Sequence, residues 1–146
     1  MSLEATIDAQ YKEALKAHDS VTVGVFRMLK SALKNAAIEA RHALSSDEEV
    51  AVLQREVKRR RESIAVFLEG GRKDLAETEQ GELVILEKYL PAQMANDQLE
   101  ALVQEVITSQ NATAKDFGKV MGAVMAKVKG QADGTRVTPI VKKLLH

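Results

Sequence analysis

Apolar residues recur at three- and four-residue steps along almost the whole chain, as in Met121, Val124 and Val128. This spacing places them on one face of an α-helix. Only two prolines, Pro91 and Pro139, interrupt a composition rich in the helix-forming residues Ala, Leu, Glu and Lys. Hydrophobic residues make up 45% of the chain but aromatic residues only 3%, so the core must be aliphatic. We therefore predict an all-α protein.

Pro91 marks the predicted domain boundary, because proline disfavours helical geometry at the residue before it. We expect an N-terminal four-helix domain over residues 1–90, a linker over 91–96 and a small three-helix domain over 97–146. The predicted apolar stripe of the second helix comprises Val21, Val25, Met28 or Leu29, Ala32 and Ala36.

Several residues of the second half indicate where helices begin and how they pack. Asn96 and Asp133 are the expected N-caps of the fifth and seventh helices. Gly118 and Gly122 lie one turn apart and are expected to let a neighbouring helix approach closely. Pro139 lies inside the seventh helix, where it removes a hydrogen bond, so we expect that helix to be distorted or to start late.

No residue pattern indicates catalysis or metal binding. The three histidines, His18, His42 and His146, have no partner at a metal-ligand spacing such as HxxxH. The chain contains neither a GxSxG nucleophile elbow nor a GxxxxGK[ST] phosphate loop. We therefore predict no catalytic residue, no cofactor and no metal.

The ends and apolar runs of the chain favour a cytoplasmic protein without a membrane segment. The start, residues 1–4, lacks the basic residues of a signal peptide, and no apolar run approaches the length of a membrane span. The absence of cysteine is compatible with a reducing cytoplasm.

The net charge of zero conceals a basic C-terminal end. From Lys115 onward there are seven basic and two acidic residues, a balance of +5. Lysines suit phosphates as point charges, whereas few aromatics are available to stack on single-stranded bases. Recognition of folded RNA by shape and backbone fits better, with a solvated positive face as the alternative. The candidate RNA-binding residues are Lys119, Lys127, Lys129, Lys142 and Lys143.

A secondary basic face is predicted in the first half of the chain. For these residues, a solvated face or ion pairs within the bundle is the default interpretation, and a nucleic-acid role is the alternative. The residues are Arg27, Lys30, Lys34, Arg55 and Arg59.

Three runs resemble a known family. They are GKVMG at residues 118–122 with KVKG at 127–130, RMLKSALKN at 27–35 and EKYLP at 87–91. These runs are spread over nearly the whole chain and resemble the GatB/YqeY family, in particular its free-standing YqeY-like branch. That family also includes the C-terminal tail of the B subunit of the tRNA-dependent amidotransferase. The resemblance implies a two-part all-helical architecture and a connection with tRNA.

The resemblance also implies a label of carbon–nitrogen ligase activity with glutamine as amido-N-donor. The sequence has no recognisable amidase Ser-Lys centre or nucleotide pocket, so we assign that chemistry to a complex rather than to this chain. Our hypothesis is a non-catalytic helical module that binds tRNA, or a tRNA-handling complex, through its last three helices. The alternative is a protein–protein adaptor for a tRNA-handling enzyme, with no direct RNA contact. A single positive face would favour RNA, and an exposed apolar groove would favour a protein partner.

Overall fold

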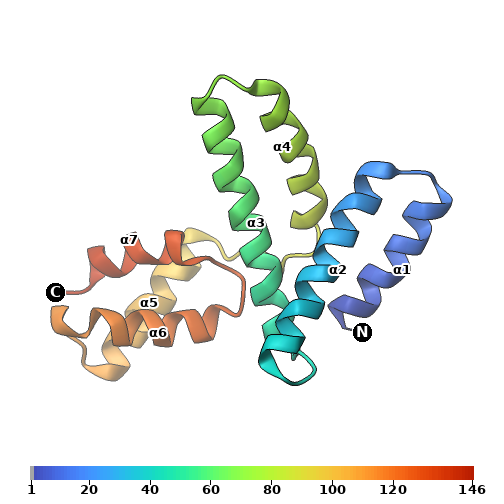
Figure 1. Ribbon diagram of the computed structural model, residues 1–146. Helices are drawn as coiled ribbons and strands as arrows, with labels where there is room; N and C mark the ends of the chain where they lie inside the picture. The colour runs from blue at the N-terminus through green and yellow to red at the C-terminus, as the bar shows by residue number, and fades with distance from the viewer. Residues whose placement is uncertain (1) are drawn as a thin grey trace. The chain divides into compact units, whose positions relative to one another are not determined.

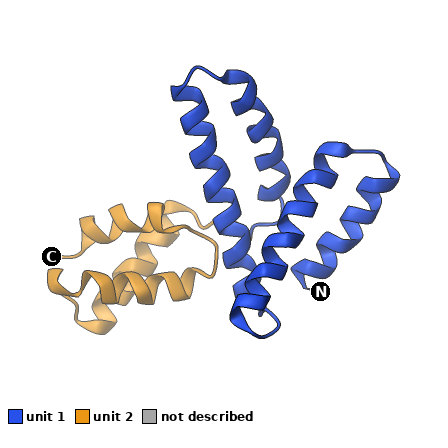
Figure 2. Cartoon of the chain, in the orientation of Figure 1, with its two compact units in different colours: residues 1–90 blue, residues 91–146 orange. Residues whose placement is uncertain are grey.

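The computed structural model describes residues 2–146 and is entirely helical, as the sequence predicts (Figure 1). Those residues form seven α-helices and one 3-10 turn, without a β-strand. The chain divides into two compact units, unit 1 over residues 1–90 and unit 2 over residues 91–146 (Figure 2). Each unit has its own hydrophobic core.

Unit 1 contains α1 (Leu3–Lys16), α2 (Ser20–Ala40), α3 (Ser46–Glu69) and α4 (Lys73–Glu87). Ser2, Asp19 and Ser45 each accept a hydrogen bond from a backbone N–H in the first turn of α1, α2 and α3. Glu48 completes a capping box with Ser45, and their hydrogen bonds hold the pKa of the Glu48 carboxyl below its ordinary value. Side-chain caps satisfy donors that a helix start leaves free, so these residues fix where three helices begin.

The core of unit 1 lies where α2 packs against the three other helices. The predicted stripe of α2 is wrong at Val21, which is 52% exposed. Of the two alternatives at the third position, Leu29 is buried and Met28 is 55% exposed. Phe26 and Leu33 are buried instead, because contacts with three helices bury a broader face than a single stripe. The Phe26 ring also meets Tyr89 edge-on, with the centroids 5.7 Å apart. The buried residues of this core are Ile7, Val25, Phe26, Leu29, Leu33, Val52, Leu53, Val57, Leu83 and Leu86.

Two charged side chains of α3 are buried and hold the helices of unit 1 together. The Glu49 carboxylate accepts hydrogen bonds from the backbone N–H groups of Leu3, at 3.4 Å, and Glu4, at 2.9 Å. It thereby supplies an anion to the first turn of α1, where the helix dipole favours negative charge. The Arg60 guanidinium pairs with Glu82 and, at 3.1 Å, with Glu79 of α4.

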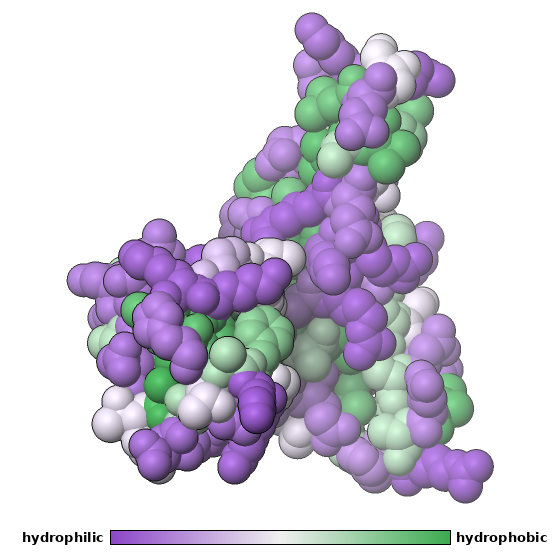
Figure 3. Space-filling view, turned by 90° about the vertical axis from the view of Figure 1, so that its left-hand side faces the viewer, coloured by the Kyte–Doolittle hydropathy of each residue, from purple (hydrophilic) through white to green (hydrophobic). Residues whose placement is uncertain are grey.

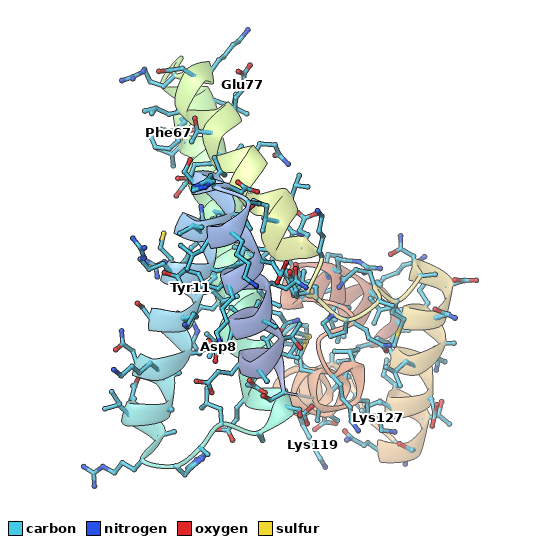
Figure 4. The ribbon with its side chains drawn as sticks, turned by 90° about the vertical axis from the view of Figure 1, so that its right-hand side faces the viewer. Asp8, Tyr11, Phe67, Glu77, Lys119 and Lys127 are labelled. Carbon is cyan, nitrogen blue, oxygen red and sulfur yellow. The ribbon has the colours of Figure 1, made fainter. Side chains whose placement is uncertain are left out.

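Helices α3 and α4 form an antiparallel hairpin that turns at Gly71, whose φ of 72° favours glycine. Apolar side chains gather at the turn end of this hairpin (Figure 3). Val66 and Leu68 are 64% and 54% exposed there, and Phe67 lies beside them (Figure 4). This end of the hairpin therefore adds little to the core of unit 1.

Unit 2 contains α5 (Asn96–Gln110), the 3-10 turn η1 (Ala114–Asp116), α6 (Phe117–Val128) and α7 (Gly134–Leu144). All three helices contact one another, so each contributes one apolar face to a common core. The buried residues of this core are Leu99, Val103, Val106, Ile107, Val120, Val124, Val128, Ala132, Val137, Val141 and Leu145.

The start of unit 2 is fixed by hydrogen bonds to the α6–α7 connection. The backbone N–H of Met94 donates to the carbonyl of Gln131 at 2.7 Å. The Arg136 guanidinium donates to the Met94 carbonyl at 2.6 Å and to Asn96 Oδ1 at 2.9 Å. The prediction that Asn96 caps α5 is therefore wrong: Ala95 occupies the N-cap position, and the Asn96 side chain accepts from Arg136.

Helix α7 begins where Asp133 predicts, because Asp133 Oδ1 accepts a hydrogen bond from the backbone N–H of Arg136. Of the two expected outcomes, the late start is wrong, since α7 runs from Gly134 to Leu144 with Pro139 inside it, whereas a local distortion of the helix stays a prediction. Pro139 is exposed, and the buried face carried by Val137 and Val141 holds α7 on the core despite the missing hydrogen bond.

Candidate nucleic-acid interface

Helix α6 places its apolar residues inward and its smallest residues outward. Val120, Val124 and Val128, at four-residue steps, are fully buried. Gly118 and Gly122 are exposed on another side of the helix. A Cβ atom built on either glycine would have no neighbour within 4 Å. The expectation that these glycines admit a neighbouring helix is therefore wrong: α5 and α7 pack on the valine face, and the glycine face is bare.

The five candidate lysines of unit 2 differ in their surroundings. Lys127 Nζ lies 3.8 Å from a Glu105 carboxylate oxygen, and Lys143 Nζ lies 3.6 Å from a Glu100 carboxylate oxygen. Both glutamates belong to α5, so these two lysines face the α5 side of their helices. Both pairs are solvent-exposed, and such pairs contribute about 0–1 kcal/mol.

The other three lysines, Lys119, Lys129 and Lys142, are exposed and form no ion pair with any residue from 2 to 146. Lys119 and Lys127 point away from α6 in different directions, with Lys127 on the side of α5 (Figure 4). The structure therefore separates the candidates into a pair that borders α5 and a set of three that is unpaired in the described chain.

Charge in unit 2 is segregated by helix. Helix α5 carries three acidic residues and no Lys or Arg. From residue 117 to residue 146 there are six Lys or Arg residues and one acidic residue, Asp133. The Asp133 carboxylate caps α7. Away from α5, the surface of α6 and α7 thus presents lysines without nearby acidic side chains on the same helices.

This segregation could have been found in the sequence, because α5 contains every acidic residue of unit 2 except Asp116 and Asp133. Counting charge from Lys115 onward detects the basic end but not the acidic helix beside it. The involvement of Arg136 in fastening the Met94 segment has no signal in the sequence, because it depends on a contact across 42 residues.

The five residues of the secondary basic face point in several directions. Lys30 Nζ is 2.9 Å from Asp8 Oδ1 and 4.7 Å from the centre of the Tyr11 ring, so it faces α1, where Figure 4 shows Asp8 and Tyr11. Lys34 lines a separate hollow next to the first turn of α1. The three remaining residues, Arg27, Arg55 and Arg59, line one groove between α2 and α3.

Within residues 2–146, no three His, Cys, Asp or Glu side chains are close enough together to hold a metal ion. No helix in that part of the chain is both long enough and apolar enough to cross a membrane.

Comparison with known proteins supplies the family. The family model described as Yqey-like protein matches residues 4–145. A Pyrenophora tritici-repentis protein named Altered inheritance of mitochondria protein 41, mitochondrial, is 26% identical over 129 residues, which cover 86% of this chain and 71% of that protein. A protein of the same name from Kluyveromyces lactis is 31% identical over 109 residues, which cover 71% of this chain and 58% of that protein. Because the family model spans both units, this chain belongs to the YqeY-like protein family.

Proposed function

We propose that this YqeY-like protein is a non-catalytic module that binds tRNA through helices α6 and α7 of unit 2. The observation that carries the proposal is the segregation of charge, with the acidic residues on α5 and six Lys or Arg residues from 117 onward. Three of them, Lys119, Lys129 and Lys142, lack an ion pair within residues 2–146, so their charge is available to a ligand.

The bare glycine face of α6 supports contact with a phosphate backbone. Gly118 and Gly122 carry no side chain that would hold a ligand away from the helix, and Lys119 lies between them in the sequence. A backbone can therefore approach the helix while lysines reach its phosphates. Such contacts fix position without reading base sequence, which suits a folded RNA recognised by its shape.

The connection with amidotransferase chemistry enters through the family. In this proposal the protein would position tRNA for an enzyme of the carbon–nitrogen ligase class that uses glutamine as amido-N-donor, without performing the reaction itself. A cytoplasmic location stays a prediction, and the two fungal relatives are named as mitochondrial proteins.

The test is binding of unfractionated tRNA to the intact protein, titrated at several salt concentrations. The variant Lys119→Ala/Lys129→Ala/Lys142→Ala is compared with Lys58→Ala/Lys73→Ala/Lys88→Ala, which removes three exposed lysines from unit 1. The association constant K falls as salt rises, so the slope of log K against log salt is negative. We expect the first triple variant to make this slope shallower by about 2–3, because each phosphate contact contributes roughly 0.7–0.9. The unit 1 variant should retain the wild-type slope. Equal losses in the two variants, or no wild-type binding at low salt, would contradict the proposal.

A protein–protein adaptor is the second candidate, and one observation favours it. The groove between α2 and α3 combines an apolar floor with arginines and is lined by residues of unit 1 alone, whereas the candidate lysines belong to unit 2. The two functions are compatible in one chain, because they use different units.

A further inference from the structure

The groove between α2 and α3 is a hollow of about 440 Å³ on unit 1. Its floor is apolar and shallow, formed by the small residues Ala32 and Ala36 and by Val52, which is 5% exposed. Met28, 55% exposed, borders the groove. A second hollow of about 340 Å³ shares Ala36, Glu39, Val52 and Arg55 with it, so the groove continues along the two helices.

The groove accounts for a sequence run that the core does not explain. Within residues 27–35, Leu29 and Leu33 are buried in unit 1, whereas Met28, Ser31 and Asn35 line the groove. Neither Ser31 nor Asn35 makes a side-chain hydrogen bond within residues 2–146, so both polar groups are available to a ligand. One face of α2 therefore serves stability and the neighbouring face is free.

The arginines of the groove are only partly neutralised. Arg59 pairs with Glu56 at 3.3 Å, and the Glu56 side chain is 14% exposed. Arg27 donates to the neutral Tyr11 hydroxyl at 3.2 Å, and Arg55 forms no ion pair with any residue from 2 to 146. Two guanidinium groups, each a planar fork suited to a carboxylate, thus border an apolar floor.

We propose that the α2–α3 groove binds an acidic amphipathic segment of a partner protein, a function independent of tRNA binding by unit 2. The segment's apolar residues would cover Ala32, Ala36 and Val52. Its carboxylates would bind Arg27 and Arg55. From Arg27 to Ala40 the groove follows α2 for roughly 20 Å, enough for a helix of about 13 residues.

The floor of the groove favours a peptide over a nucleic acid. Glu39 also lines the groove and would repel a carboxylate as it would a phosphate, so it does not distinguish the two ligands. The apolar floor matches leucine-like side chains but has no aromatic ring on which a base could stack. Arginines beside a small apolar floor are also the type of group that contributes most to protein–protein affinity.

The test begins with a phage library of random peptides of about 13 residues, selected against the intact protein. We expect the recovered sequences to combine Asp or Glu with Leu, Ile or Met at helical spacing. A fluorescently labelled synthetic copy is then titrated with the wild type, with Arg27→Glu/Arg55→Glu and with the control Lys58→Glu/Lys88→Glu. The charge changes are matched, and both control lysines are exposed and outside the groove.

The expected result is a loss of at least about tenfold in affinity for Arg27→Glu/Arg55→Glu and no change for the control. Ser31→Phe, which fills the groove without altering its arginines, should weaken binding as well. Circular dichroism of each variant verifies that the helices are intact. The proposal is overturned if no peptide is enriched or if the recovered peptides lack carboxylates. It is also overturned if the peptide affinities of Arg27→Glu/Arg55→Glu and Ser31→Phe equal that of the wild type. It is also overturned if Arg27→Glu/Arg55→Glu abolishes tRNA binding while leaving peptide binding unchanged.

Discussion

Lys129 offers a substitution that separates stability from RNA binding. It is the C-cap of α6 and adopts a left-handed backbone, with φ 46° and ψ 47°. The following residue, Gly130, also has a positive φ, of 84°. Glycine is the usual residue at a left-handed helix end, because an L side chain there brings Cβ close to the following carbonyl oxygen. The chain nevertheless places a lysine at this position.

Lys129→Gly is expected to stabilise the protein. Removing Cβ from a left-handed position relieves about 1–2 kcal/mol. The greater freedom of glycine in the unfolded chain opposes this by about 0.5–1 kcal/mol. The net gain is therefore about 0–1.5 kcal/mol, centred on about 0.75 kcal/mol. For a chain of this length, the central value raises the melting temperature by roughly 1.5–3 °C.

The same substitution should weaken tRNA binding, because it removes one unpaired cation from the proposed interface. One lost phosphate contact lowers the salt slope by about 0.7–0.9. Lys129→Ala is the matched control: it removes the same charge but keeps Cβ, so binding should fall equally while stability stays near that of the wild type.

Thermal unfolding followed by circular dichroism and salt-titrated tRNA binding measure the two effects on the same samples. If Lys129→Gly is no more stable than Lys129→Ala, the argument from the left-handed backbone is refuted. If both variants bind tRNA with the wild-type slope, Lys129 makes no phosphate contact, and the interface must be assigned to other residues.

Two further predictions concern the buried charges of unit 1. Glu49→Gln should lower the free energy of unfolding by about 1–2 kcal/mol in urea titrations, because a neutral amide accepts more weakly from the first turn of α1; an unchanged midpoint would show that Glu49 does not hold α1. Arg60→Met should cost about 3 kcal/mol, because it leaves Glu79 and Glu82 without their cation. Adding Glu79→Gln and Glu82→Gln should recover most of that loss, and a triple variant as unstable as Arg60→Met alone would contradict the ion-pair explanation.

The helical class could be predicted because it depends on local signals. Apolar spacing and side-chain caps act within a few residues, and Asp133 begins α7 as its cap position predicts. The failures are tertiary. A single stripe cannot represent α2, which contacts three helices, so the predicted stripe omits the buried residues Phe26 and Leu33. Pro139 does not delay α7, because burial of Val137 and Val141 outweighs the loss of one hydrogen bond.

The Gly118/Gly122 pair shows why the site was harder to predict than the fold. Small residues one turn apart have the same spacing whether they face another helix or solvent, so spacing alone does not distinguish packing from exposure. In this structure α5 and α7 pack on the valine face of α6, and the glycine face therefore stays exposed. In the same way, the sequence shows that Lys127 and Lys143 are basic. It does not show that α5 places a carboxylate within 4 Å of each of them.

The net charge of zero is consistent with a polyanion-binding surface, because most of the acidic and basic residues of unit 2 lie on different helices. Unit 2 contains seven basic and five acidic residues, a balance of only +2. Three of the five acidic residues are on α5, and Asp116 and Asp133 accept hydrogen bonds from backbone N–H groups. Screening at physiological salt acts over about 8 Å, so a phosphate at the glycine face of α6 responds to the nearest lysines more than to the sum over the chain. Local arrangement rather than net charge therefore determines whether this unit can hold a phosphate backbone.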